Sequence, residues 1–159
     1  MNLSVQELEL ILSEFSLLTD QNIIEERSAI LNEWKESLES LPTALEIIQS
    51  SQSQNLFLFA TIKIEFCLEK QFNDLNEDAI KTIFDNCMGR IISNREDHSL
   101  PQNNLDHLYN IIAIITSHSS QLFNEISSSN QFSPEEQTCF FYNLLTELNK
   151  DSELTESQQ

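Results

Sequence analysis

Residues 31–38 read LNEWKESL and contain Trp34, the only tryptophan in a chain of 159 residues. Trp34 follows Leu31 by three positions and precedes Leu38 by four, a spacing that places the three side chains on one face of a helix. The charged residues of the stretch fall on the other side, so the helix is amphipathic and Trp34 belongs to its buried stripe. Pro42 comes soon after and fits the first turn of a next helix, where its missing N–H is tolerated.

Turn-forming residues are scarce, because Gly89 is the only glycine and there are three prolines. Phosphate-binding loops and dinucleotide fingerprints need several glycines, so both are excluded. Strand-rich folds also need more turn residues, and we therefore expect helices almost throughout. Gly89 lies inside an apolar helical pattern and should weaken that helix by about 1 kcal/mol relative to alanine.

The charge of the chain is strongly one-sided, with 26 acidic residues, 8 basic residues and a net charge of -18. Such a chain repels phosphate backbones, so we expect no direct binding to nucleic acid. The same charge favours encounter with a basic protein surface. No stretch approaches the ~18 consecutive apolar residues of a membrane span, so membrane insertion is not expected.

The first residues, MNLSVQELEL, lack a basic region followed by an apolar one, so we expect no signal peptide. Cys67, Cys87 and Cys139 should then be reduced thiols in the cytosol or nucleus. They are far apart and fall on or beside apolar stripes, where cysteine packs as a small hydrophobe.

Apolar spacing and capping signals predict eight helical segments. The first should open at Ser4, with Glu7 three residues later completing a capping box. The last should open at Ser133, followed by Pro134 and two glutamates. The expected segments are 4–18, 22–40, 43–50, 56–72, 76–92, 104–118, a weakly helical 119–132 and 134–148, with a disordered acidic tail over 151–159.

The openings of successive helix pairs fall near residues 4, 42, 76 and 119, at steps of about 40 residues. That period is typical of HEAT repeats, in which each pair buries one face against the next. We expect an all-α fold over residues 1–150, a right-handed α-solenoid of about four stacked HEAT-like antiparallel helix pairs. An ordinary helical bundle is the alternative. In a solenoid that lacks a polar capping repeat, Phe140, Phe141 and Leu145 of the last pair should be partly uncovered.

Several landmarks in the sequence resemble the N-terminal domain of the importin-β (karyopherin-β) superfamily, nearest its transportin-SR and exportin branches. The similarity lies in residues 26–49 (ERSAILNEWKESLESLPTALEIIQ), 53–75 (SQNLFLFATIKIEFCLEKQFNDL) and 133–153 (SPEEQTCFFYNLLTELNKDSE). The landmarks are Asn32-Glu33-Trp34, the apolar stripe Ala44, Ile47 and Ile48, the helix entry Leu58-Phe59-Ala60 and the helix exit Phe72-Asn73-Asp74-Leu75.

The resemblance implies a nuclear transport receptor that shuttles between nucleus and cytoplasm. In such receptors the second helix of each pair contacts the small GTPase Ran in its GTP form. Cargo protein and nucleoporins would be further partners if the chain is part of a longer receptor. The Ran-contacting residues would be Thr61, Glu65, Glu69, Asp106 and Asn110. The alternative is that these side chains are ordinary solvated surface residues. The repeat-interface residues would be Trp34, Phe59, Phe66, Phe84 and Phe141.

Family members are much longer, so the chain is a fragment, a truncated product or a short relative, and importin and exportin roles both stay open. The rival hypothesis is a helical-repeat scaffold or adaptor that binds a basic protein or peptide without any GTPase. Dependence on the nucleotide state of the partner would separate the two, because a scaffold has no reason to distinguish GTP from GDP.

Catalytic and metal-binding patterns are not expected. Paired carboxylates such as Glu25–Glu26 and Glu135–Glu136 are explained by solvated helix faces rather than by an enclosed acid–base pair. The histidines do not share a helical face at metal-ligand spacing, and none lies near a cysteine at zinc spacing; they are His98, His107 and His118. We therefore predict a binding protein, not an enzyme, with no cofactor.

Overall fold

The computed structural model describes residues 3–15, 17–129 and 132–157, with side chains described except at 128–129 and 151–157. Within these residues the fold is all-α, which confirms the predicted class, and contains no strand. The helices are α1 (Val5–Phe15), α2 (Gln21–Glu36), α3 (Leu41–Ser50), α4 (Gln54–Lys70), α5 (Glu77–Asp97), α6 (Gln102–Ser117), α7 (Ser120–Ser129) and α8 (Pro134–Ser157), with short 3-10 helices η1 (Leu38–Ser40) and η2 (Phe72–Asp74).

The two capping boxes read from the sequence are present. At the start of α1 the Ser4 N–H donates to Glu7 Oε2 over 2.9 Å, and the Glu7 N–H donates to Ser4 Oγ over 3.2 Å. At the start of α8 the Ser133 N–H donates to Glu136 Oε1 over 2.7 Å, and the Glu136 N–H donates to Ser133 Oγ over 3.3 Å. Each box satisfies two backbone donors that a helix start leaves open.

Some helix ends differ from the prediction. α2 ends at Glu36 rather than near residue 40, because the chain turns through η1 before Pro42 enters the first turn of α3. α5 continues to Asp97, beyond the predicted 92, and ends at His98 in the left-handed region with φ 51°. α8 runs to Ser157, into the stretch for which the sequence predicts a disordered tail.

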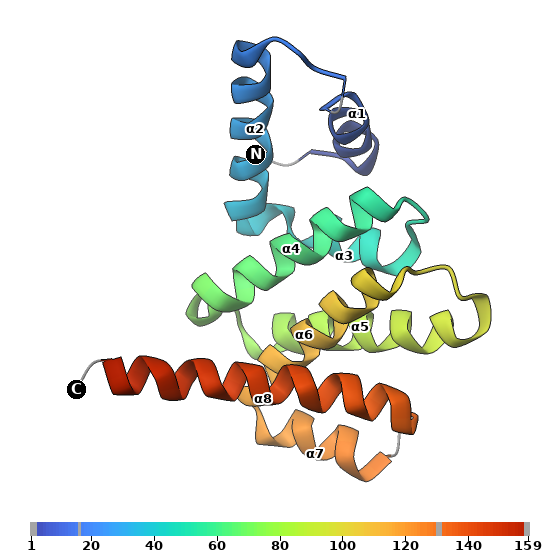
Figure 1. Cartoon of the computed structure of the whole chain (residues 1–159), viewed down its shortest axis with the longest axis vertical. Coiled ribbons are helices and arrows are strands. Elements are labelled where there is room, and N and C mark those ends of the chain that lie inside the picture. Colours follow the sequence, from blue (N-terminus) through green and yellow to red (C-terminus); the bar gives the residue numbers. More distant parts are fainter. Residues whose placement is uncertain (1–2, 16, 130–131, 158–159) are drawn as a thin grey trace.

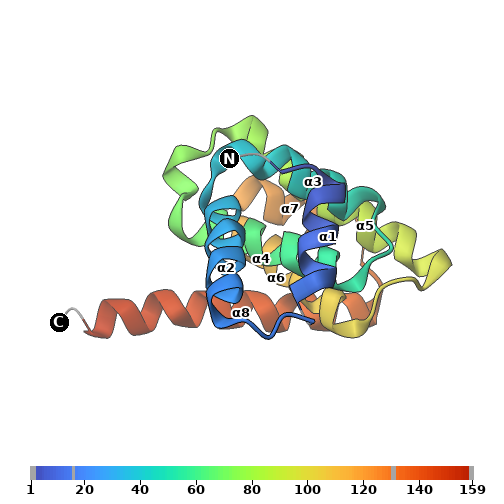
Figure 2. The same cartoon turned by 90° about the horizontal axis from the view of Figure 1, so that it is seen from above.

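The helices follow one another through the molecule from blue at one end to red at the other (Figure 1). α2 packs against α4, α4 against α6, and α6 against α8. We call these four helices the even row. On the other side α3 packs against α5, and α3 and α5 also contact α4 and α6 respectively. Seen from above, α8 lies along one side of the molecule and α3 and α5 lie toward the other (Figure 2).

α6 is the centre of the core. All six residues from Ile111 to Thr116 are buried, and the helix packs against α4, α5, α7 and α8. A helix that is apolar on every side is stable only when neighbours cover it all round. Of the helices described, none combines the length and the apolar character that crossing a bilayer requires.

Candidate functional site

The residues predicted to contact a partner lie on α4 and α6 of the even row, but in unequal environments. Thr61 is fully buried, and its hydroxyl donates to the Leu58 carbonyl over 2.6 Å. Its side chain therefore has no exposed surface to offer a partner. Glu69 and Asp106 are exposed, at the end of α4 and the start of α6.

Glu65 and Asn110 are hydrogen-bonded to each other, and a third residue, His107, which was not predicted at the site, joins them. Glu65 Oε1 lies 2.5 Å from His107 Nδ1, and Asn110 Nδ2 donates to Glu65 Oε2 over 3.2 Å. The hydrogen bond to the Glu65 carboxylate raises the pKa of His107 above its ordinary value, and the charges of Glu65 and Asp106 act in the same direction, while burial opposes them. We call Glu65, His107 and Asn110 the α4–α6 seam.

The two exposed carboxylates, Glu69 and Asp106, make solvent-exposed contacts within the chain. Asp106 accepts from Gln102 Nε2 over 2.9 Å, one turn away on α6. Glu69 lies 4.0 Å from Lys150 of α8, and Lys150 is also 3.4 Å from Glu147. An exposed ion pair of 4.0 Å is weak, and the hydrogen bond to Asp106 is exposed to water, so both carboxylates can exchange their contacts for a partner's cations.

The residues predicted at repeat interfaces are mostly inside the molecule. Trp34 of α2 is fully buried and stacks on Phe59 of α4, with ring centroids 5.3 Å apart. Phe66 lies under the ammonium group of Lys35 at 5.1 Å, and Phe84 is buried. Phe141 differs, because 43% of its surface is exposed.

A buried lysine joins α2 to α4. Lys63 Nζ donates to the carbonyls of Trp34 (3.0 Å), Lys35 (3.1 Å) and Ser37 (2.6 Å), all at the C-terminal end of α2. The ammonium group also lies 5.1 Å from the Trp34 ring, and Ser40 Oγ donates to the Trp34 carbonyl over 2.6 Å. A cation here satisfies open carbonyls and complements the negative end of the helix dipole. We call this arrangement the Lys63 joint.

A buried arginine repeats the arrangement one helix further on. Arg90 of α5 donates to the carbonyls of Gln49 and Ser51 at the end of α3 and to Ser99 Oγ, each over 3.2 Å. Its guanidinium carbon lies 5.6 Å from the centre of the Phe57 ring of α4. Its Nε is buried with no hydrogen-bond partner among the described residues. We call this arrangement the Arg90 joint.

The two joints shape the electrostatics of the exterior. Lys63 and Arg90 bind carbonyl and hydroxyl oxygens rather than carboxylates. Of the eight basic residues of the chain, six therefore remain to balance 26 acidic residues. Several of those six are already paired, such as Arg95 with Glu136 at 2.6 Å and Lys81 with Glu125 at 3.1 Å. The outside of the molecule therefore presents an excess of carboxylates to any partner.

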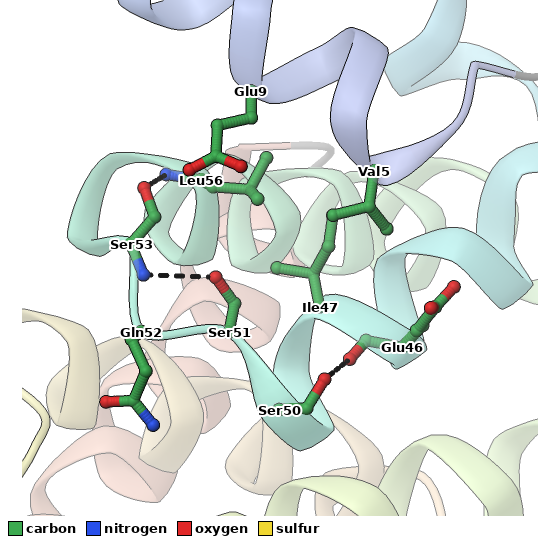
Figure 3. A pocket seen from close by; sticks show the side chains of 9 residues that line it. All are labelled: Val5, Glu9, Glu46, Ile47, Ser50, Ser51, Gln52, Ser53 and Leu56. Carbon is green, nitrogen blue, oxygen red and sulfur yellow. Dashed lines mark hydrogen bonds between the residues drawn. The ribbon is translucent and has the colours of Figure 1, made fainter.

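A hollow of about 270 Å³ lies between α1, the end of α3 and the start of α4 (Figure 3). Its apolar walls include Val5, Ile47 and Leu56, and two carboxylates line it, Glu9 from α1 and Glu46 from α3. The serine hydroxyls at its edge are engaged in local hydrogen bonds, as Figure 3 shows. No basic side chain is among its lining residues, so the hollow fits an apolar stem that ends in a cation.

Cysteine thiols and metal-ligating side chains are the groups that covalent catalysis or a metal site would need. Burial raises the pKa of Cys87 to about 12 and also raises the pKa of Cys67, so both thiols stay protonated near neutral pH. In the described part of the chain, no group of three or more histidine, cysteine and acidic side chains is placed to hold a metal ion.

Comparison of the chain with protein-family models, with curated proteins and with solved structures finds no match. The likeness to importin-β domains therefore depends on the sequence landmarks quoted above.

Proposed function

We propose that the chain is the N-terminal portion of a nuclear transport receptor that binds Ran in its GTP form. The observation that carries the proposal is the carboxylate excess of the exterior, which favours encounter with a basic protein surface. The landmarks around Trp34 and Phe59 support Ran as that partner, because they resemble importin-β domains. Cargo, nucleoporins and shuttling between nucleus and cytoplasm would belong to a longer receptor of this kind.

The proposal includes the architecture expected from the sequence, a right-handed α-solenoid of about four HEAT-like antiparallel pairs over residues 1–150. The contacts of the even row, together with the contact of α3 with α5, support it. Linked helices of this kind can change curvature as a set. Binding of the GTPase would then select one curvature and alter cargo affinity through linkage.

Within the even row, Glu69 and Asp106 are the carboxylates that would meet basic groups of Ran. The α4–α6 seam would hold the two helices in register beneath them, because Glu65 is already bound by His107 and Asn110. Thr61 would act only as a packing residue of α4. This division separates residues that contact the partner from residues that position the helices.

Titration calorimetry against Ran loaded with a non-hydrolysable GTP analogue, and separately with GDP, tests the proposal. We expect binding to the GTP form only. The double variant Glu69→Lys/Asp106→Lys should bind about tenfold more weakly at low salt, with a smaller difference at high salt. Glu46→Lys on α3 makes the same kind of charge change away from the even row and should bind as the wild type does. Equal binding of both nucleotide forms, or none by a folded sample, would contradict the proposal.

The second candidate is a scaffold that binds a basic peptide, and the hollow between α1 and α3 favours it. Glu9 and Glu46 would receive a lysine or arginine head while Ile47 and Leu56 contact its stem. A lysine-rich peptide should then bind regardless of any nucleotide, and Glu9→Gln/Glu46→Gln should weaken it more than Glu69→Gln/Asp106→Gln. The opposite ranking would exclude the hollow as the peptide site.

A further inference from the structure

α8 carries two parallel stripes of apolar side chains, and only one of them is covered. Phe140 and Leu144 face the core. Phe140 is fully buried, and Leu144 is 8% exposed. One position further along the helix, about 100° around its axis, Phe141, Leu145 and Leu148 are 43%, 62% and 46% exposed. Their spacing of four and three residues aligns them along the helix. The adjacent Tyr142 is 71% exposed. We call these four residues the outer stripe of α8.

The outer stripe begins at a hollow between α7 and α8. The hollow has a volume of about 170 Å³, and Phe141 lines it together with Ile126, Phe132 and Phe140. Phe140 packs against both other phenylalanines, with ring centroids 5.5 Å from Phe132 and 5.3 Å from Phe141. The aromatic wall is therefore held from behind by the core. A partner's apolar side chain would enter the hollow, and the rest of the stripe would continue the contact.

The net charge of the chain selects the partner. Lys63 and Arg90 are buried, which leaves six basic residues for 26 acidic ones. On α8 itself, Lys150 already lies within 4.0 Å of Glu147 and Glu69. A second copy of the chain would bring its own net charge of -18 against this helix, so self-association is opposed by repulsion. A cationic partner is favoured by the same charges.

We propose that the outer stripe of α8, with the hollow beside α7, is a docking surface for a cationic amphipathic helix of a partner protein. Anchors at helical spacing in a partner match the straight stripe of Phe141, Leu145 and Leu148, as in other helix-in-groove complexes. Lysine or arginine residues flanking those anchors would be attracted by the carboxylate excess of the exterior. The surface is separate from Glu69 and Asp106 on α4 and α6, so it is a second interaction site and does not depend on Ran binding.

The test uses a fluorescent peptide of about 18 residues, with leucines on one helical face and lysines on its flanks, titrated with the full chain by fluorescence anisotropy. Leu145→Ser/Leu148→Ser should weaken binding at least about tenfold, since both leucines lie in the contact. The matched control is Leu10→Ser/Leu17→Ser, which removes two leucines that are 57% and 79% exposed at the other end of the molecule. The control should bind the peptide like the wild type, and circular dichroism should show both variants folded.

Two further peptides separate the contributions of shape and charge. A peptide of the same composition, reordered so that its leucines surround the helix, should bind at least about tenfold more weakly. A peptide with glutamates in place of the lysines should not bind. Equal binding of the reordered or the acidic peptide would overturn the proposal, and so would equal loss in both leucine variants. A wild-type dimer that Leu145→Ser/Leu148→Ser dissociates would also overturn it, because the occupant would be a second copy.

Discussion

The Lys63 joint and the Arg90 joint both use a buried cation to bind carbonyls at the C-terminal end of a helix, but their hydrogen bonds differ in length. In each, a cation from one helix binds carbonyls at the C-terminal end of another and lies over an aromatic ring. Lys63 directs all three of its donors at the end of α2, with one bond as short as 2.6 Å. Arg90 makes three bonds of 3.2 Å and leaves Nε without a partner among the described residues. We infer that the Lys63 joint is the more tightly bound and the Arg90 joint the more easily disturbed.

The largest effect should come from Lys63→Met, which keeps the length of the stem and removes the ammonium group. Three carbonyls at the end of α2 would lose a charged donor inside the protein, and we expect a loss of about 3 kcal/mol in the free energy of unfolding. Urea denaturation followed by circular dichroism measures it. Lys70→Met, on the exposed part of the same helix, is the control and should change stability by less than about 0.5 kcal/mol.

Arg90→Met should cost less, about 2 kcal/mol, because its bonds are longer and one buried nitrogen is already unpaired. The same denaturation experiment applies, with Arg27→Met as the control for loss of an exposed guanidinium 4.0 Å from Glu14. If Arg90→Met is more damaging than Lys63→Met, the ranking of the two joints is wrong.

Ser40→Ala sharpens the comparison, since the Lys63 joint has a second donor on two of its carbonyls. Ser40 Oγ lies 2.6 Å from the Trp34 carbonyl and 2.7 Å from the Ser37 carbonyl, so its one proton is shared between two acceptors that Lys63 also binds. We expect a loss of about 1 kcal/mol. The loss should be non-additive with Lys63→Met, because the two side chains share acceptors. Additive losses in the double variant would show that the two donors act independently.

Gly89→Ala should have the opposite sign and stabilise the helix that carries Arg90. Gly89 is exposed within α5, and a Cβ built there meets nothing within 4 Å. The gain should be about 1 kcal/mol from helix propensity. For a chain of this size that corresponds to a rise of roughly 2–4 °C in Tm, measurable by calorimetry. A fall in Tm would mean that the Arg90 joint needs a flexible α5.

The α4–α6 seam provides a third link, and its contribution to stability should depend on pH near neutrality. His107 has a raised pKa in the folded protein, so its contribution to stability is fully present below about pH 6.5 and is lost as the pH rises through the folded value. A double-mutant cycle of His107→Gln with Glu65→Gln should therefore give a larger coupling energy at pH 6 than at pH 8. A coupling that does not change with pH would rule out a charged histidine in the seam.

Much of the fold could be predicted from local signals, while the joints could not. The capping boxes at Ser4 and Ser133 depend on residues three positions apart, and both are present as predicted. Lys63 lies on the buried stripe of Ala60, Ile64 and Cys67, and a lone cation on an apolar stripe was the available signal. Which carbonyls it binds is fixed by tertiary packing, since they lie 26 to 29 residues earlier in the chain.

The same division applies to the predicted site. Helical spacing correctly placed Thr61, Glu65 and Glu69 on one helix. It did not predict how deeply each side chain is buried. Thr61 is covered by neighbours that the spacing cannot identify, and Glu65 is bound by His107, 42 residues away. On α8 the expectation of uncovered apolar residues was right for Phe141 and Leu145 and wrong for Phe140, which the aromatic cluster buries.

Because Lys63 is buried, the rate at which its amine is chemically labelled should report the opening of the first helices. An amine-reactive reagent needs a neutral, accessible amine, and Lys63 Nζ is enclosed by the three carbonyls that it binds. Exposed lysines such as Lys70 and Lys150 should be labelled at once, whereas Lys63 should be labelled only when α2 separates from α4. The rate of Lys63 modification would thus report how often the Trp34 end of the molecule opens while the rest stays folded.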